Sequence, residues 1–499
     1  MRLCVMLLLL LPLLCLASLG RACLTPEEAY RFTGAVCRLT YPAALVLNEK
    51  TTRVIEAAFQ HAKYPSIEGE KNMMVFGKVS YGLHNLEIHN LSIGRSEVEL
   101  RAGEGIGIAI SNVSAVFKGT IKYGYGSWLI KVSQTVDFEI ESQIDLGINP
   151  KLYCGAGKVA ADTSDCYLTF HKLKLILQGQ REPGWLRRVF TDFVTFTVKL
   201  VIKGQICKEI NNVANILADF VQDQAEQFLS DGNIGVDIGV TSAPAITSNY
   251  IESYHKGLIT YNNTIAVIDA SVFHPSQLTE DRMLYFWISD EVLNPIMSAA
   301  HHDGRFVRNI TGAELTDLFK TDLSTEMPAS IKQILSSEAA VLTARSVRAP
   351  QLWNAPDGTH VKAVAAVELF PGPPSSDSPS LYFETEVEVC VHTSYAEKKL
   401  ILNAKALNIS IDRILQNQDA IALEEALVNY FREAVAKIGI SKVTSYLEPS
   451  LTALMDRQGL YLFDIINPEV VTQNGYVVVQ MGFGFPHHLL VEFLKKTLV

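Results

Sequence analysis

The stretch VDFEIESQIDLGI, residues 136–148, is the strongest indicator of the fold. Its apolar residues share one parity and its acidic residues share the other: Val136, Phe138, Ile140, Ile144, Leu146 and Ile148 against Asp137, Glu139, Glu141 and Asp145. Successive side chains of a β-strand point to opposite faces of a sheet. The alternation therefore predicts a strand, or a pair of strands, with one buried apolar face and one solvent-exposed polar face.

The same pattern extends over residues 83–150. Ile106, Ile108 and Ile110 alternate in the same way, and the glycines at 105, 107, 124 and 126 predict the bulges and bends that curl a sheet. Gly103, Gly105 and Gly107 also resemble a dinucleotide-binding loop, but Ile108 stands where the third glycine is needed. We therefore predict a long, curved antiparallel sheet in the first half of the chain.

Helical periodicity flanks this sheet and returns in the second half. Apolar spacing predicts helices near 54–62, from about 183 to 220, over 290–301 and over 423–438. Residues 284–288 look like a strand, and Asn474-Gly475 between two apolar runs is typical of a hairpin turn. Residues 269–282 have the composition of a linker, and 370–380 that of an exposed loop. The prediction is an α+β protein with two halves.

The pattern of residues 1–22 predicts a secretory signal peptide. Arg2 precedes the apolar run 5–16, and the small residues Gly20 and Ala22 suit a cleavage site. A transmembrane anchor is the alternative, but the run is short for one. No later segment is apolar enough to span a membrane, so we expect a secreted protein without a transmembrane anchor.

The charge and hydropathy of the chain limit the classes of partner that it could bind. Without Arg2 and Arg21, 41 of the 43 basic residues remain against 53 acidic residues, a formal net charge of −12. This balance argues against nucleic acid as a partner and disfavours a cationic grip on anionic lipid. Hydrophobic residues make up 48% of the chain, and the mean hydropathy is +0.16. Some apolar surface could face a ligand, although a large ordinary core gives the same values.

Six cysteines follow the predicted signal peptide, namely Cys23, Cys37, Cys154, Cys166, Cys207 and Cys390. An oxidising compartment permits disulfides among them, and the sequence does not choose the pairs. Five N-x-S/T sequons begin at Asn90, Asn112, Asn262, Asn309 and Asn408. In a secreted protein we expect some of these asparagines to carry glycans at the surface.

The chain shows no hydrolase or metal motif of the usual kinds. It contains no G-x-S-x-G elbow, no H-E-x-x-H and no C-x-x-C. His301, His302 and Asp303 are consecutive, and neighbouring residues of a helix diverge, so polarity at a helix end explains them better than a metal site. We expect no catalytic residues, no metal and no cofactor; a hydrolase with dispersed catalytic residues is the remaining enzymatic alternative.

The last thirteen residues, 487–499, form an amphipathic pattern. One stripe is apolar, consisting of Leu489, Leu490, Phe493, Leu494 and Leu498, and the other carries Glu492, Lys495 and Lys496. A helix this short is marginal in water and needs an apolar partner. The segment is either a lid over an apolar interior or a terminal helix packed permanently on its own core, and the spacing fits both.

Several longer segments resemble the family of lipid-transfer and lipopolysaccharide-binding proteins. They are YGLHN (81–85), DCYLTFHKL (165–173), REPGW (181–185), KGQICKEIN (203–211), LSDGNIGVDI (229–238), DRMLYFW (281–287), LFDIINPE (462–469) and GFGFPHHLLVEFL (482–494). The resemblance implies a boomerang of two curved β-barrels with flanking helices, joined by a central antiparallel sheet, and a C-terminal amphipathic helix. It divides the chain into a signal peptide 1–22, an N-terminal barrel 23–215, a central-sheet segment 216–268, a linker 269–282, a C-terminal barrel 283–460, return strands 461–486 and a lid helix 487–499.

The implied function is exchange of cholesteryl esters and triglycerides, with phospholipid, between lipoprotein particles (HDL, LDL and VLDL) through an apolar tunnel, in reverse cholesterol transport. The resemblance also implies a Cys166–Cys207 disulfide, lipid contacts at Gln222, Ser253 and His255, and the lid role of 487–499. Gln224 departs from the family's mammalian arginine, which puts a charged headgroup contact in doubt. From the residues alone, Ser253 and His255 are best explained as ordinary sheet residues; the alternative is that both contact one lipid ester or phosphate, because residues two apart on a strand share a face. The alternative function is lipopolysaccharide or phospholipid binding without neutral-lipid transfer.

Overall fold

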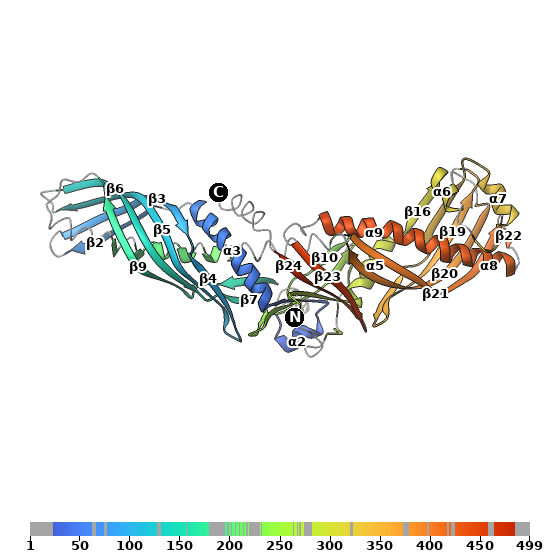
Figure 1. The fold of residues 1–499 in the computed structure, drawn as a ribbon, viewed down its shortest axis with the longest axis horizontal. Coiled ribbons are helices and arrows are strands. Elements are labelled where there is room, and N and C mark those ends of the chain that lie inside the picture. Colours follow the sequence, from blue (N-terminus) through green and yellow to red (C-terminus); the bar gives the residue numbers. More distant parts are fainter. Residues whose placement is uncertain are drawn as a thin grey trace, which may run out of the picture.

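The structure, a computed structural model, describes residues 23–484 with gaps, the longest of which are 179–194, 219–229, 274–281, 373–378 and 458–463. Figure 1 shows an elongated, bent molecule with one large curved sheet at each end and a smaller sheet at the bend. In the described part of the chain, no helix is long and apolar enough to cross a membrane. The predicted signal peptide 1–22 and lid helix 487–499 lie outside the described residues.

The N-terminal sheet has the hydrogen-bonded order β2-β3-β5-β6-β9, with β4 paired to β5. Its strands are β2 (Ile67–Met73), β3 (Gly77–Ser92), β4 (Arg95–Arg101), β5 (Gly105–Gly126), β6 (Lys131–Ile148) and β9 (Cys166–Leu177). All six apolar residues of 136–148 are buried, which confirms the alternation. Ile202 and Ile206, from the helical residues described between 195 and 218, pack onto that buried apolar face. The amphipathic helix α3 (Tyr41–His61) also contacts this sheet.

Three register shifts of this sheet occur at asparagines and a fourth occurs beside His171 in the β6–β9 pairing, so the expectation of bulges at Gly124 and Gly126 was wrong. Both glycines keep regular pairing with β6. The β3–β5 register shifts instead beside Asn85 and Asn90, and the β5–β6 register beside Asn112. All three have positive φ, between 51° and 57°. Asparagine tolerates this left-handed conformation better than most residues, which suits it to the extra residue of a bulge.

The C-terminal sheet repeats this construction. Its order is β16-β17-β19-β20-β21-β22, with β18 paired to β19. The strands are β16 (Val307–Thr311), β17 (Val341–Ser346), β18 (Gln351–Ala355), β19 (Gly358–Phe370), β20 (Leu381–Ala396), β21 (Lys399–Gln416) and β22 (Asp419–Ala420). A continuous helical rod follows, consisting of α8 (Glu425–Ala434), the π-helical turn η2 (Val435–Gly439) and α9 (Ile440–Arg457). Tyr430 and Phe431 of α8 are buried against the sheet, together with the short helices α6 (Gly312–Leu318) and α7 (Ala329–Leu335).

The central sheet assembles strands from distant parts of the chain in the order β11-β12-β1-β15-β24-β23. They are β1 (Ala35–Thr40), β11 (Ala245–Ile246), β12 (Tyr250–His255), β15 (Leu284–Ser289), β23 (Asp464–Gln473) and β24 (Tyr476–Gly484). The predicted hairpin at Asn474-Gly475 is confirmed, with Gly475 at a φ of 83°. The helices α2 (Pro26–Arg31) and α5 (Asp290–His302), the β7–β8 hairpin (Lys151–Gly155 and Lys158–Asp162) and the small sheet β10-β13-β14 (Gly235–Asp237, Leu258–Tyr261 and Thr264–Ala266) complete the fold.

The fold is therefore two domains of mostly antiparallel β-sheet with some helices. Among the described residues both large sheets are open paths of paired strands, and the closed barrels of the expectation are not among the pairings. Most of the expected linker 269–282 lies outside the described residues. Gly103 and Gly105 have positive φ in the β4–β5 turn, so this glycine segment is a hairpin bend.

Candidate lipid-binding face of the central sheet

One face of the central sheet is buried against other residues, and the other face is only partly covered. The packed face buries Val36, Tyr254, Tyr285, Trp287 and Val478 in one cluster. The opposite face has apolar residues on four adjacent strands that are only partly buried or exposed: Ile251, Cys37, Leu39, Phe286, Ile288, Val477 and Val479. Phe286, at its centre, is 37% exposed. We call this set of residues the open face.

The open face lies between two packed regions. At one end, Ala43 and Leu47 of α3 pack against Leu39, Leu284 and Met481. At the other end, Ile288 packs against the cluster around Val292 of α5. The pairing register places Ser253, Cys37, Phe286 and Val479 in one row across the sheet, between these two regions. Cys37 and Val479 of this row also pack against the first region, and Phe286 is the most exposed of the apolar residues on this face.

Ser253 and His255 are the polar groups of this face, and they bond to each other. Ser253 Oγ lies 2.8 Å from His255 Nε2, and His255 Nδ1 lies 2.7 Å from the carbonyl oxygen of Ile238. A carbonyl can only accept, so Nδ1 carries the proton and Nε2 of the neutral ring accepts from the Ser253 hydroxyl. Both side chains thus have hydrogen-bond partners within the protein, so placing them on an apolar face costs little free energy.

Burial keeps the titratable groups of the open face uncharged. Desolvation lowers the pKa of His255, and the hydrogen bond to the Ile238 carbonyl only partly opposes this effect. Burial, followed by the nearby charge of Glu252, raises the pKa of the Cys37 thiol to about 12. At neutral pH the face therefore presents a neutral imidazole, a hydroxyl and a protonated thiol among apolar side chains.

A serine hydroxyl bonded to a histidine also occurs in serine hydrolases, but the surroundings here do not favour that chemistry. In a hydrolase, a carboxylate behind the histidine stabilises the imidazolium that forms. Behind His255 stands the neutral carbonyl of Ile238, and burial further lowers the pKa of the ring. Both features disfavour transfer of a proton from Ser253 to His255. The arrangement suits binding of an uncharged ligand.

On the packed face, a buried ion pair fixes the register of β1 and β12. Arg38 and Glu252 are direct partners, with an N–O distance of 2.6 Å and side chains that are 2% exposed. The Tyr254 hydroxyl donates to Glu252 at 2.5 Å, and the Arg38 guanidinium lies 3.8 Å from the ring centre of Tyr250. These additional partners compensate the desolvation of two charges. No local pattern in the sequence marks this pair, because its members are more than 200 residues apart.

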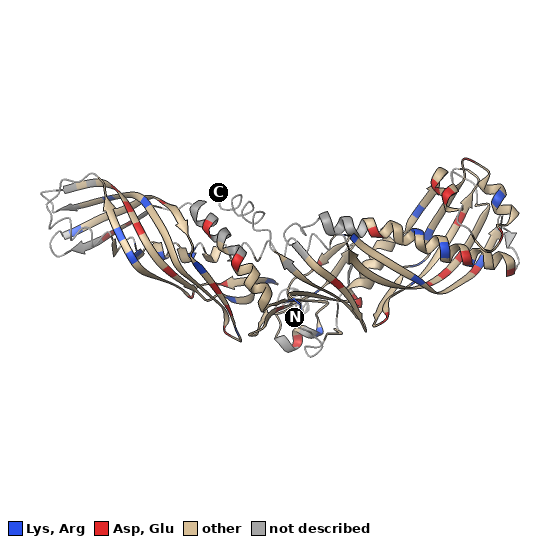
Figure 2. Ribbon diagram, in the orientation of Figure 1, with Lys and Arg blue, Asp and Glu red and all other residues tan. Residues whose placement is uncertain are grey.

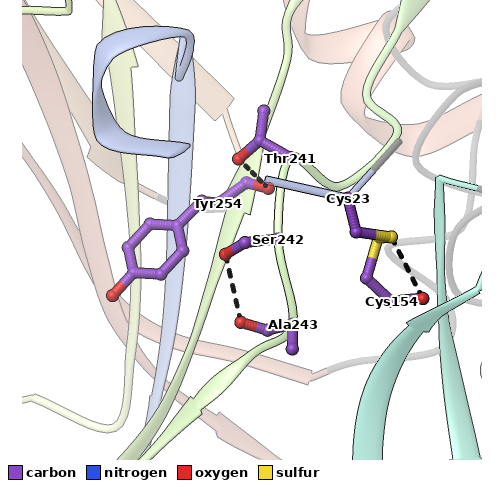
Figure 3. The surroundings of a disulfide bond; sticks show 6 residues. All are labelled: Cys23, Cys154, Thr241, Ser242, Ala243 and Tyr254. Carbon is purple, nitrogen blue, oxygen red and sulfur yellow. Dashed lines mark hydrogen bonds between the residues drawn. A yellow bond between two sulfur atoms is a disulfide. The ribbon is translucent and has the colours of Figure 1, made fainter. Parts of the chain in front are cut away.

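Two disulfides connect the N-terminal half. The Cys166–Cys207 bond joins the start of β9 to the adjacent helix, the pairing that the family resemblance implies. The Cys23–Cys154 bond, which the sequence left open, joins the first of the described residues to β7 (Figure 3). Leu24 N then donates to Thr241 O at 2.8 Å, and Thr241 N to Tyr254 O at 2.9 Å. This disulfide therefore lies next to the segment that supports β12 and His255. Cys37 and Cys390 remain free thiols.

The other predicted site residues divide into three groups. Gln222, Gln224 and the lid residues Leu489, Leu490, Phe493, Leu494 and Leu498 lie outside the described residues. The five sequon asparagines are all exposed. His301 and His302 stand at the end of α5, and Asp303 bonds Arg305 and Asn233, which agrees with polarity at a helix end.

The fold and the open face define a two-domain, mostly antiparallel β protein with an uncharged apolar surface at its centre. Family models for the LBP / BPI / CETP family match residues 45–220 with the N-terminal domain and residues 229–457 with the C-terminal domain. The chain belongs to this family.

Two relatives that match this chain over nearly their whole length carry the same name. The chain is 46% identical over 491 residues to the "Cholesteryl ester transfer protein" of Gallus gallus, covering 97% of both chains. It is 44% identical to the protein of the same name from Homo sapiens, covering 97% of this chain and 98% of that one. The "Lipopolysaccharide-binding protein" of Mus musculus is 24% identical over 55% of this chain and 56% of its own.

Proposed function

We propose that this protein transfers cholesteryl esters, triglycerides and phospholipid between lipoprotein particles along a continuous apolar path. The open face of the central sheet is the observation that carries the proposal. Neutral lipids are nearly insoluble in water, so an apolar surface lowers the barrier to moving them without any bond being made or broken. The relatives named for cholesteryl ester transfer, which match nearly the whole chain, support this cargo.

The chemistry of the open face suits neutral cargo. The partly exposed residues are aliphatic and aromatic, and the three polar groups are uncharged at neutral pH. The Ser253 hydroxyl can rotate from His255 Nε2 to an ester or phosphate oxygen, because a hydroxyl proton reorients freely. We propose that Ser253, His255 and Gln222 make such contacts and that phospholipid closes the ends of the path.

The distribution of charge argues against a lipopolysaccharide receptor. Figure 2 shows basic and acidic residues interspersed in both domains, and the formal net charge is −10. A surface that grips an anionic headgroup needs concentrated positive charge.

The remaining expectations belong to the same proposal. We propose that the two curved sheets are barrels of a boomerang, that 487–499 forms a lid over one opening of the path, and that HDL, LDL and VLDL are the exchange partners. We also propose secretion into plasma. Two disulfides and exposed sequons support an extracellular setting.

The test is a substitution of Phe286, at the centre of the open face. In Phe286→Asp, a charge stands where cargo would pass, so cholesteryl ester transfer between lipoproteins should fall at least tenfold. Mass spectrometry of the gently purified protein should show loss of bound cholesteryl ester and triglyceride. Val307→Asp is the matched control, because Val307 is 53% exposed on β16, away from the face. Its transfer rate should stay within twofold of the wild type.

Three outcomes would overturn the proposal. Wild-type protein that contains phospholipid but no neutral lipid, and binds endotoxin at physiological salt, would favour the alternative function. Equal transfer by the Phe286 and Val307 variants would show that cargo does not touch the open face. Release of fatty acid from cholesteryl ester would show hydrolysis rather than transfer.

A further inference from the structure

A separate cluster of metal-ligating side chains lies in the C-terminal domain, where the β18–β19 turn meets β20. Asp357, His360 and Cys390 each offer one ligand atom, and these atoms all lie within 4.8 Å of one another. The pairing register accounts for the cluster, because His360 stands directly opposite Cys390 on the neighbouring strand. Asp357 is exposed at the turn, so the cluster can be reached from solvent.

One nitrogen of the His360 imidazole lacks a hydrogen-bond partner. His360 is 9% exposed, and its Nε2 lies 3.1 Å from Asp357 Oδ1. Its Nδ1 is buried and has no hydrogen-bond partner among the described residues. A buried polar atom without a partner costs free energy that a bound cation would recover. Either ring nitrogen of a neutral imidazole can bind a metal, and zinc bound at Nδ1 would supply the partner that this atom lacks.

The surrounding backbone fits a ligand site. A Cβ at Gly358 would lie 2.5 Å from Cys390 Sγ and 3.6 Å from His392 Cε1, so the thiol and a second imidazole occupy the space that any side chain there would need. His392 lies two residues beyond Cys390 and therefore on the same face of β20. Trp353 stacks on His360 with ring centres 5.2 Å apart, which fixes the ring orientation.

We propose that Asp357, His360, Cys390 and His392 bind one zinc ion. Thiolate sulfur, imidazole nitrogen and carboxylate oxygen are the ligands of tetrahedral zinc, whereas calcium and magnesium take oxygen ligands. Zinc lies about 2.0–2.3 Å from such atoms, so the ligand atoms of Asp357, His360 and Cys390, which lie within 4.8 Å of one another, need to close by less than about 1 Å. This site is independent of the lipid proposal.

The position of the site suggests what the ion does. Asn354, at the end of β18, receives the Gly475 N–H on its carbonyl at 3.1 Å and donates its own N–H to Asp290 at 2.8 Å. The same hairpin thus contacts both α5 and the β23–β24 turn. A zinc ion that joins the β18–β19 turn to β20 would stiffen the hairpin where the C-terminal domain meets the central sheet.

The test uses cobalt as a spectroscopic substitute for zinc in the full-length, metal-stripped, unreduced protein. Cobalt should give a thiolate-to-metal charge-transfer band at one ion per chain, and zinc, but not calcium, should abolish it. Cys390→Ser and His360→Gln should remove the band. Cys37→Ser and His302→Gln should retain it, because they remove the same groups elsewhere. A wild type without the band, or a band that survives in Cys390→Ser, would overturn the proposal.

A second measurement needs no variant and so does not depend on variant folding. Zinc should slow alkylation of Cys390 by iodoacetamide at least tenfold in the wild-type protein, as followed by mass spectrometry of the Cys390 peptide. The same measurement with calcium in place of zinc is the control, and calcium should leave the rate at Cys390 unchanged. An unchanged rate at Cys390 would contradict the site.

Discussion

Arg38 and Glu252 show how much of the central sheet depends on single side chains. Their charges are almost fully buried and lie directly opposite each other on β1 and β12. Removing one member of such a pair leaves the other charge buried and uncompensated, which is far worse than never having had the pair. The pair therefore selects this register and opposes a slip of one residue, which would turn the open face inward.

We expect Glu252→Gln to lower the free energy of unfolding by about 3–5 kcal/mol, because the variant removes the negative charge that lies 2.6 Å from the buried Arg38. Urea unfolding followed by fluorescence measures the change. The matched control is Glu326→Gln, which breaks the exposed pair with Lys332 and should cost less than about 1 kcal/mol. Equal losses in the two variants would mean that the buried pair has no special role.

The bulged strands of the N-terminal sheet depend on left-handed asparagines. Asn85 has a φ of 53° and lies outside the sequons, so it tests backbone conformation alone. Asn85→Ala should lower the free energy of unfolding by about 1–2 kcal/mol, because alanine has a Cβ clash in this region. Asn85→Gly should be nearly neutral, since glycine adopts positive φ readily. Thermal unfolding of both variants distinguishes them; an alanine variant as stable as the glycine variant would contradict the strain argument.

Glu433 anchors the helix α8 to the segment between α6 and α7. Its carboxylate accepts hydrogen bonds from the backbone and hydroxyl groups of Ser324 and Thr325 and lies 2.7 Å from Lys437 Nζ. The bond from Lys437, followed by those from Ser324 and Thr325, holds the pKa of Glu433 well below its usual range.

This lowered pKa predicts an acid-dependent contribution to stability. The contribution is fully present above the ordinary glutamate pKa of 4.5 and falls as pH drops below it, because the unfolded chain takes up the proton first. The wild type should therefore exceed Glu433→Gln in stability at pH 7, and the difference should shrink between pH 4.5 and pH 3. Urea titrations at several pH values measure it, with Glu425→Gln on the same helix as control. A pH-independent difference would contradict the linkage.

Elements with local patterns were the ones that the sequence predicted well. The strand alternation at 136–148, the Asn474-Gly475 turn and the helix over 290–301 need only neighbouring residues, and all three are confirmed. The central sheet could not be predicted in this way, because its order joins strands more than 200 residues apart. The Cys23–Cys154 bond joins residues 131 apart, and the cluster around His360 depends on the pairing of β19 with β20, so neither follows from a local pattern. Ser253 and His255 were named through family resemblance, and their mutual hydrogen bond comes from the structure.

For the molecule as a whole, the lid proposal predicts that changes in residues 487–499 reduce lipid transfer without reducing the stability of the fold. Phe493→Asp places a charge on the apolar stripe of 487–499, so it should impair neutral-lipid transfer strongly while the melting temperature changes little. Truncation after Pro486 should have the same effect, with bound lipid measured in both proteins. A collapse of stability in either protein would identify the segment as part of the core and end the lid interpretation.

The asparagine bulges also affect how carbohydrate on this protein should be studied. Asn90 and Asn112 are both sequon acceptors and left-handed bulge residues. The common replacement of asparagine by glutamine would remove the glycan and strain the strand at once, so a loss of secretion could be blamed on the wrong cause. Ser92→Ala and Ser114→Ala abolish the same sequons and leave the bulges intact. We expect these serine variants to fold normally and Asn112→Gln to be less stable, so comparing the two sets separates the contribution of the sugar from that of the backbone.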